Sequence, residues 1–146
     1  MATHHDDAPR HPRRLGRVQR AGTALTGLVL LLFGVLGLLS QVDFFDSRGD
    51  TVAGLGTNGA LGTLSLCAGL LLLAGAAIGG PFAPQIDLVV GVAFLVSGFV
   101  NLALLGTGLN LLAFRLPNVL VSFAVGVLLM ALGGYEKGRR LRHPRR

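Results

Sequence analysis

Four apolar segments, each close to 20 residues long, constrain this chain more than any other feature. They cover residues 22–40, 60–78, 86–105 and 117–134, and the central part of each contains no charged residue. A helix of about 20 apolar residues crosses the roughly 30 Å hydrocarbon layer of a membrane. Turn-forming sequences such as DSRGD, GGPFAP and GTGLN separate the segments. We therefore predict an all-α, polytopic transmembrane four-helix bundle.

The basic residues lie almost entirely outside this apolar region. Of the 13 Lys and Arg residues, only Arg48 and Arg115 fall between residues 21 and 135. This divides the chain into a basic tail at 1–20, a four-span domain at 21–135 and a second basic tail at 136–146. Positively charged flanks stay on the cytoplasmic side of a membrane. Because four spans return the chain to its starting side, we expect a multi-pass protein of the cytoplasmic membrane with both termini cytoplasmic.

The net charge of +6 does not indicate a nucleic-acid partner, because the basic residues flank apolar segments. We expect the bilayer itself to be the partner, with the tails held at anionic lipid headgroups. The arginines expected to bind headgroups are Arg13, Arg14, Arg17, Arg20, Arg139 and Arg140.

The first apolar segment follows basic residues, as a cleaved signal peptide would. It is long for the apolar part of a signal peptide, and the residues after it, LLSQVDFFDS, contain no small-residue cleavage site. We expect it to be retained as a membrane helix.

Serine and glycine recur at one offset within the apolar segments. Ser65 and Ser122 are 57 positions apart, as are Gly69 and Gly126, and the same offset relates Gly34 to Gly91. It also relates Ser40 to Ser97. This pattern predicts two parallel repeats of a helical hairpin. Chance matches within low-complexity apolar sequence are the alternative.

Small residues also have a packing role. Membrane helices gain no hydrophobic stabilisation from one another, so they associate where small residues let their backbones approach. One small face per span favours a tight bundle. Gly75 and Gly79 form a further GxxxG pair that suits contact within or between chains. The residues predicted to pack helices are Gly34, Gly37, Ser65, Gly69, Gly75, Gly79, Gly91, Gly98, Ser122 and Gly126.

Sequence motifs for catalysis are missing. There is no nucleophile–base pair, phosphate-binding loop, dinucleotide fingerprint or zinc spacing, and Cys67 is the single cysteine. We expect no enzyme activity, no catalytic residues, no cofactor and no metal site. Asp87 is expected at the start of the third helix, where the helix dipole favours a carboxylate.

Two segments carry a resemblance to a known family. TNGALGTLSLCAGLLLLAG and NLLAFRLPNVLVSFAVGVLLMALGG resemble an uncharacterised actinobacterial four-span membrane family, domain of unknown function 4383. The resemblance covers about Arg17 to Tyr135, and it implies fold and location only. This chain has Ser65 and Ser122 where the family pattern has histidine.

Together these features favour a structural or accessory membrane protein. It would act through helix–helix contacts with itself, as a homo-oligomer, or with a larger membrane complex. The alternative is a small channel or carrier for a neutral or weakly polar solute. In that case Asn58, Asn101 and Asn118 would form a polar pocket.

Overall fold

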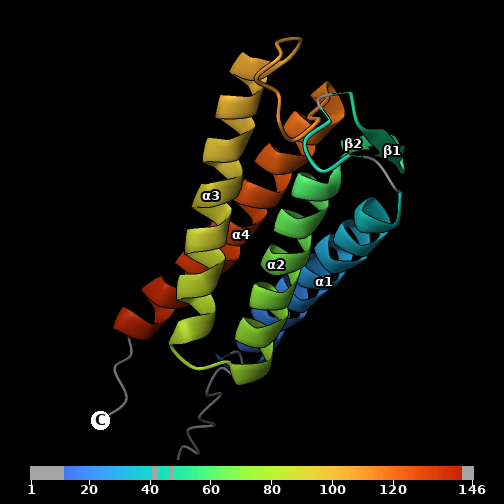
Figure 1. Cartoon of the computed structure of the whole chain (residues 1–146). Coiled ribbons are helices and arrows are strands. Elements are labelled where there is room, and N and C mark those ends of the chain that lie inside the picture. The colour runs from blue at the N-terminus through green and yellow to red at the C-terminus, as the bar shows by residue number, and fades with distance from the viewer. Residues whose placement is uncertain (1–11, 41–42, 47, 143–146) are drawn as a thin grey trace, which may run out of the picture.

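The computed structural model describes residues 12–40, 43–46 and 48–142, with side chains from residue 16 onward. It contains four helices: α1 (Pro12–Leu39), α2 (Gly59–Ile78), α3 (Phe82–Leu104) and α4 (Leu116–Arg142). A small antiparallel hairpin, β1 (Asp50–Val52) and β2 (Leu55–Thr57), lies between α1 and α2 (Figure 1). All four helices are long and apolar enough to cross a membrane. The all-α four-helix prediction is confirmed, and by length and composition the chain is a multi-pass membrane protein.

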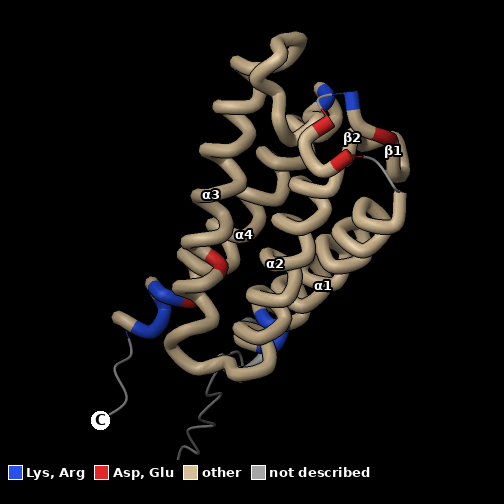
Figure 2. Tube along the Cα trace, in the orientation of Figure 1, with Lys and Arg blue, Asp and Glu red and all other residues tan. Residues whose placement is uncertain are grey.

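The two ends of the bundle differ in what they carry. The start of α1 and the end of α4 lie at one end, which we call the termini end (Figure 1). The β-hairpin lies at the opposite end, which we call the hairpin end. The basic residues of the described helices gather near the termini end, while Asp43, Asp46 and Asp50 lie near the β-hairpin (Figure 2). The long faces of the bundle between the two ends are apolar.

The helix boundaries depart from the sequence-based spans where polar residues extend a helix. Helix α1 begins inside the predicted tail at 1–20, and α4 continues through the predicted tail at 136–146 as far as Arg142. Arginine and lysine are good helix formers, so a helix does not end where its hydrocarbon-crossing part ends. Helix α3 begins at Phe82, four residues before the predicted 86. Its Pro84 lies in the first turn, where a missing N–H costs nothing.

The first connection contains strands that the hydropathy pattern did not predict. Ala53 and Gly54 both have positive φ, 53° and 82°, and they link β1 to β2 with Val52 opposite Leu55. Positive φ at both central residues is what a two-residue hairpin turn requires. The β-hairpin makes the connection from Ser40 to Asn58 longer than the connection from Leu105 to Arg115.

Helices α1 and α2 meet along a line of glycines, the first glycine seam. A Cβ atom placed on Gly34 would lie 2.5 Å from the backbone N of Leu66 and 2.7 Å from the carbonyl oxygen of Gly62. One on Gly69 would lie 2.6 Å from the carbonyl oxygen of Gly27. Only glycine permits this backbone-to-backbone contact, as expected for small residues between membrane helices.

Helices α3 and α4 form a second glycine seam. A Cβ atom on Gly91 would lie 2.9 Å from the carbonyl oxygen of Gly126, and one on Gly98 would lie 2.8 Å from the Phe123 ring. Gly27 contacts Gly69 in the first seam as Gly91 contacts Gly126 in the second.

Residues of α4 therefore correspond to residues of α2 that lie 57 positions earlier, as predicted. Residues of α3 correspond to residues of α1 that lie 64 positions earlier. Gly34 contacts Leu66 as Gly98 contacts Phe123, so Gly34 corresponds to Gly98. The sequence-based match of Gly34 with Gly91 is displaced by seven residues, about two helical turns. The longer first connection, with its β-hairpin, accounts for this displacement.

The remaining predicted packing residues also contact their own chain. A Cβ atom on Gly37 would meet the Thr57 hydroxyl at 2.5 Å, and one on Gly75 would meet the Ile86 side chain at 3.0 Å. Gly79 has a φ of 66° and lies against Arg20. The GxxxG pair is thus used within the chain, between α2 and its neighbours.

Candidate functional site

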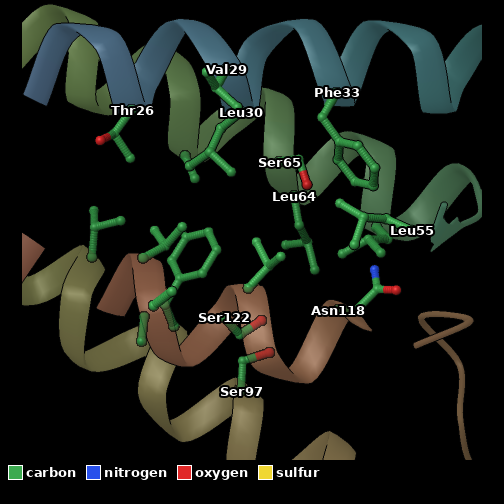
Figure 3. Close-up of a pocket in the computed structure, with 18 of the residues that line it drawn as sticks. Thr26, Val29, Leu30, Phe33, Leu55, Leu64, Ser65, Ser97, Asn118 and Ser122 are labelled. Carbon is green, nitrogen blue, oxygen red and sulfur yellow. The ribbon is translucent and has the colours of Figure 1, made fainter. Parts of the chain in front are cut away.

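A crevice of about 910 Å³ separates the two helical hairpins. Figure 3 shows α1 and α2 on one side and α3 and α4 on the other, with their side chains directed into the space between. The walls are mostly leucine, valine, alanine and phenylalanine side chains. No charged residue lines the crevice in the part of the chain that the structure describes.

The crevice opens sideways, through the long faces of the bundle. Several of its wall residues are large apolar side chains that are also exposed on the outside, among them Leu25, Leu64 and Val89, which are 64%, 55% and 67% exposed. In a bilayer these residues face hydrocarbon. The entrance to the crevice is therefore on the lipid side of the protein.

Two apolar layers border the crevice. One buried residue from each helix contributes to a layer formed by Leu30, Leu72, Val90 and Leu129, of which Leu30 and Val90 also line the crevice. On the hairpin side, Leu61, Phe114 and Val119 form a second layer, against which Phe33 and Phe123 pack. The crevice continues past the second layer to Val52, Ala53 and Leu55 of the β-hairpin.

A polar contact joins the two hairpins beyond the first layer, and we call it the termini clasp. It consists of Gln19 and Thr23 of α1 and Asp87 of α3, all of them buried. The Gln19 Nε2 group donates to Asp87 Oδ2 at 2.6 Å, and the Thr23 hydroxyl lies 2.9 and 3.0 Å from the two Asp87 oxygens. Thr23 and Asp87 are 64 positions apart, so they hold equivalent positions in the two hairpins.

The expectation that Asp87 marks the start of the third helix is wrong. Asp87 is the sixth residue of α3, the N-cap position belongs to Pro81, and the Asp87 side chain is fully buried. Sequence reasoning placed Thr23 on a helix-packing face and did not predict that Gln19 and Thr23 bind Asp87. The available signal was their spacing of four residues, which places two polar side chains on one helix face.

Asparagines join the α1–α2 hairpin to the α3–α4 hairpin at the end of the bundle that carries the β-hairpin. We call these bonds the hairpin clasp. Asn118 of α4 accepts from the Gly56 N–H at 2.7 Å and donates to the Gly56 carbonyl at 2.8 Å. Asn58 caps α2 by accepting from the Leu61 N–H at 2.9 Å, and its amide donates to the Leu111 carbonyl at 2.7 Å. These bonds hold the β-hairpin against α4 and the loop that precedes it.

The three asparagines of the predicted polar pocket are not brought together at the crevice. Asn118 lines it, whereas Asn58 and Asn101 are not among its wall residues. Asn101 is buried, and its amide donates to the Ser97 carbonyl within the same helix at 2.9 Å.

Ser65 and Ser122 line opposite walls of the crevice, on α2 and α4 (Figure 3). Both residues are buried, with 6% and 4% of their surface exposed. Neither hydroxyl makes a hydrogen bond to a described residue. Both are accessible from the crevice, since Thr57 Oγ1 is the one fully buried side-chain oxygen without a partner in the described structure. Of the two recurring Ser–Gly pairs, the glycines thus pack helices within the hairpins, and the serines face the space between them.

The predicted headgroup arginines differ in their surroundings. Arg20 donates from Nε to the Ala76 carbonyl at 2.8 Å, at the carboxyl end of α2. Arg139 and Arg140 form ion pairs with the buried Glu136 at 2.8 and 3.1 Å. Arg17 is exposed, and the side chains of Arg13 and Arg14 lie outside the described part.

No protein-family model, curated protein or solved structure matches this chain. The resemblance to the four-span family stays a prediction, and the site is interpreted from its own geometry.

Proposed function

We propose that this chain is a structural or accessory protein of the cytoplasmic membrane whose working surface is the crevice, which takes up an apolar component of the bilayer. The observation that carries the proposal is a space of about 910 Å³ that has mostly apolar walls and is bordered by large apolar side chains exposed on the outside of the bundle. Cavities of roughly 300–1,000 Å³ suit small-molecule ligands. An unfilled space would forfeit dispersion contacts along its walls, which favours an occupant drawn from the hydrocarbon layer.

The proposed orientation places the termini end in the cytoplasm. Eleven of the 13 basic residues belong to the two sequence tails that flank this end, and such flanks stay cytoplasmic. Arg17 and the neighbouring tail residues would then lie at anionic headgroups. The small faces of the four helices pack against other helices of the same chain. Contacts with a second copy or a larger complex would therefore use the exposed leucine and valine side chains.

The alternative of a small channel or carrier for a neutral solute has less support. Such a route needs polar groups along the bundle axis and an opening at both ends. The amides of Asn58, Asn101 and Asn118 are each engaged with backbone carbonyls. The walls of the crevice are mostly apolar, and no charged residue of the described chain lines them.

Native mass spectrometry of the full-length protein, released from detergent micelles, tests crevice occupancy. Ala93 lines the crevice, and Ala103 is exposed on the same helix outside it. We expect the wild-type protein and Ala103→Phe to retain a lipophilic molecule that Ala93→Phe loses, because the new ring fills the site. A wild-type protein without a retained molecule, or equal retention by the two variants, would contradict the proposal.

A further inference from the structure

The unpartnered hydroxyls of Ser65 and Ser122 indicate what kind of molecule the crevice holds. A hydroxyl that lies in an apolar environment without a partner costs free energy. Helical serine and threonine commonly avoid this cost by donating to the carbonyl four residues earlier. Thr26 and Thr63 do so here, to Gly22 and Gly59, each at 2.8 Å. Ser65 and Ser122 do not make this bond, and both face the crevice.

The two serines hold equivalent positions in the two hairpins. They are 57 positions apart, the same offset that relates the seam glycines Gly69 and Gly126. Each seam glycine follows its serine by one helical turn, so the seams fix where both serines lie. Two hydroxyls that make no hydrogen bond within the described chain therefore face one mostly apolar space from opposite walls. The Ser97 hydroxyl, which accepts from the Asn101 amide, lines the same space.

We propose that the crevice binds a neutral, elongated lipophilic molecule with a carbonyl oxygen within its apolar body, and that Ser65 and Ser122 bind this oxygen. A carbonyl oxygen has two lone pairs and no hydrogen to donate, which suits hydroxyl donors on either side. A charged group does not fit, because no charged side chain among the described residues lines the walls. This inference rests on the proposed function, since it assumes that the crevice has an occupant.

The chain contains its own reporter for this site. Cys67 is the single cysteine of the sequence, it is exposed, and it belongs to the crevice wall two residues after Ser65. An occupant should therefore slow alkylation of the Cys67 thiol. The measurement needs no engineered cysteine.

The experiment compares two probes that differ by one carbonyl group, heptadecan-9-one and heptadecane. The full-length protein is placed in nanodiscs of dimyristoyl phosphatidylcholine, and the rate of Cys67 alkylation by N-ethylmaleimide is followed by mass spectrometry. We expect the ketone to halve this rate at about a tenfold lower mole fraction than the alkane, as one or two hydrogen bonds in a membrane would produce.

Serine variants assign the preference to the two hydroxyls. The double variant Ser65→Ala/Ser122→Ala should treat both probes alike, and each single variant should be intermediate. Ser40→Ala is the matched control, because the Ser40 hydroxyl already donates to the Gly37 carbonyl at 2.7 Å, outside the crevice. Its preference for the ketone should equal that of the wild type. Alanine is a good helix former, so these variants should fold.

The outcomes separate the two proposals. Equal protection by ketone and alkane in the wild type overturns carbonyl recognition and leaves uptake of apolar molecules in place; a water molecule bound to the serines would give this result. A ketone preference that survives in the double variant also overturns it. If neither probe slows alkylation, or if a partner helix protects Cys67 before any probe is added, both proposals fail.

Discussion

The contacts within each helical hairpin differ from the contacts between the two hairpins. Within a hairpin, glycines let one backbone touch the next, as Gly34 does against Leu66 and Gly69 against Gly27. Between the two helical hairpins, leucine, valine and phenylalanine side chains line the crevice and do not close it. Lipid tails are as apolar as leucine, so apolar residues alone do not hold membrane helices together. Small residues fix the distance within each hairpin, and polar clasps at the two ends fix it between them.

The largest expected effect comes from a methyl group placed in a seam. In Gly34→Ala, the new Cβ would lie 2.5 Å from a backbone nitrogen that cannot move without its helix. We expect a loss of about 3 kcal/mol in the free energy of unfolding, as for severe overpacking. Denaturant titration in mixed micelles measures it.

Gly138→Ala is the matched control, because a Cβ atom there meets no atom within 4 Å in the described structure. This variant should gain up to about 1 kcal/mol from helix propensity. Equal losses in the two variants would show that the seam contact is not what holds α1 to α2.

A smaller effect should follow when the termini clasp is removed. Asp87→Leu takes away the nearer acceptor of the buried Gln19 amide, which then keeps only the Thr23 hydroxyl at 3.4 Å. We expect a loss of about 2 kcal/mol in the same titration. Asp87→Asn keeps one acceptor oxygen and should lose less. If leucine proved at least as stable as aspartate, the clasp would not contribute to joining the hairpins.

The smallest effect on stability should come from the crevice wall. Ser65→Ala/Ser122→Ala removes two hydroxyls that make no hydrogen bond within the described chain. We expect the free energy of unfolding to change by less than about 0.5 kcal/mol, with the slight gain that alanine brings to a helix. A loss of more than about 2 kcal/mol in the free energy of unfolding would mean that the two serines stabilise the fold. The crevice wall would then contribute to stability as the glycine seams do.

Hydropathy predicted the number and class of the elements because charge is excluded from hydrocarbon over whole segments. It did not predict the β-hairpin, since Ala53 and Gly54 depend on turn geometry within a connection. Nor did it predict the depth of Asp87. That depth follows from α3 beginning at Phe82, and a buried carboxylate needs donors from another helix, which a linear pattern does not reveal.

The Ser–Gly pairs show the same limit for the site. Sequence reasoning assigned Ser65 and Gly69 one packing role, although adjacent turns of a helix can face different neighbours. Gly69 faces α1 and Ser65 faces the crevice. A small residue in a membrane helix indicates close approach or an open space, and only the neighbouring helices decide which.

If the crevice takes up a component of the bilayer, as proposed, the lateral opening changes what affinity means for this protein. A molecule that enters from the side never passes through water on its way in, so its binding is governed by its mole fraction among the surrounding lipids and not by its aqueous concentration. Neighbouring acyl tails, always present in excess, compete for the same space. Selectivity must then come from the few chemical groups by which the bound molecule differs from an ordinary lipid.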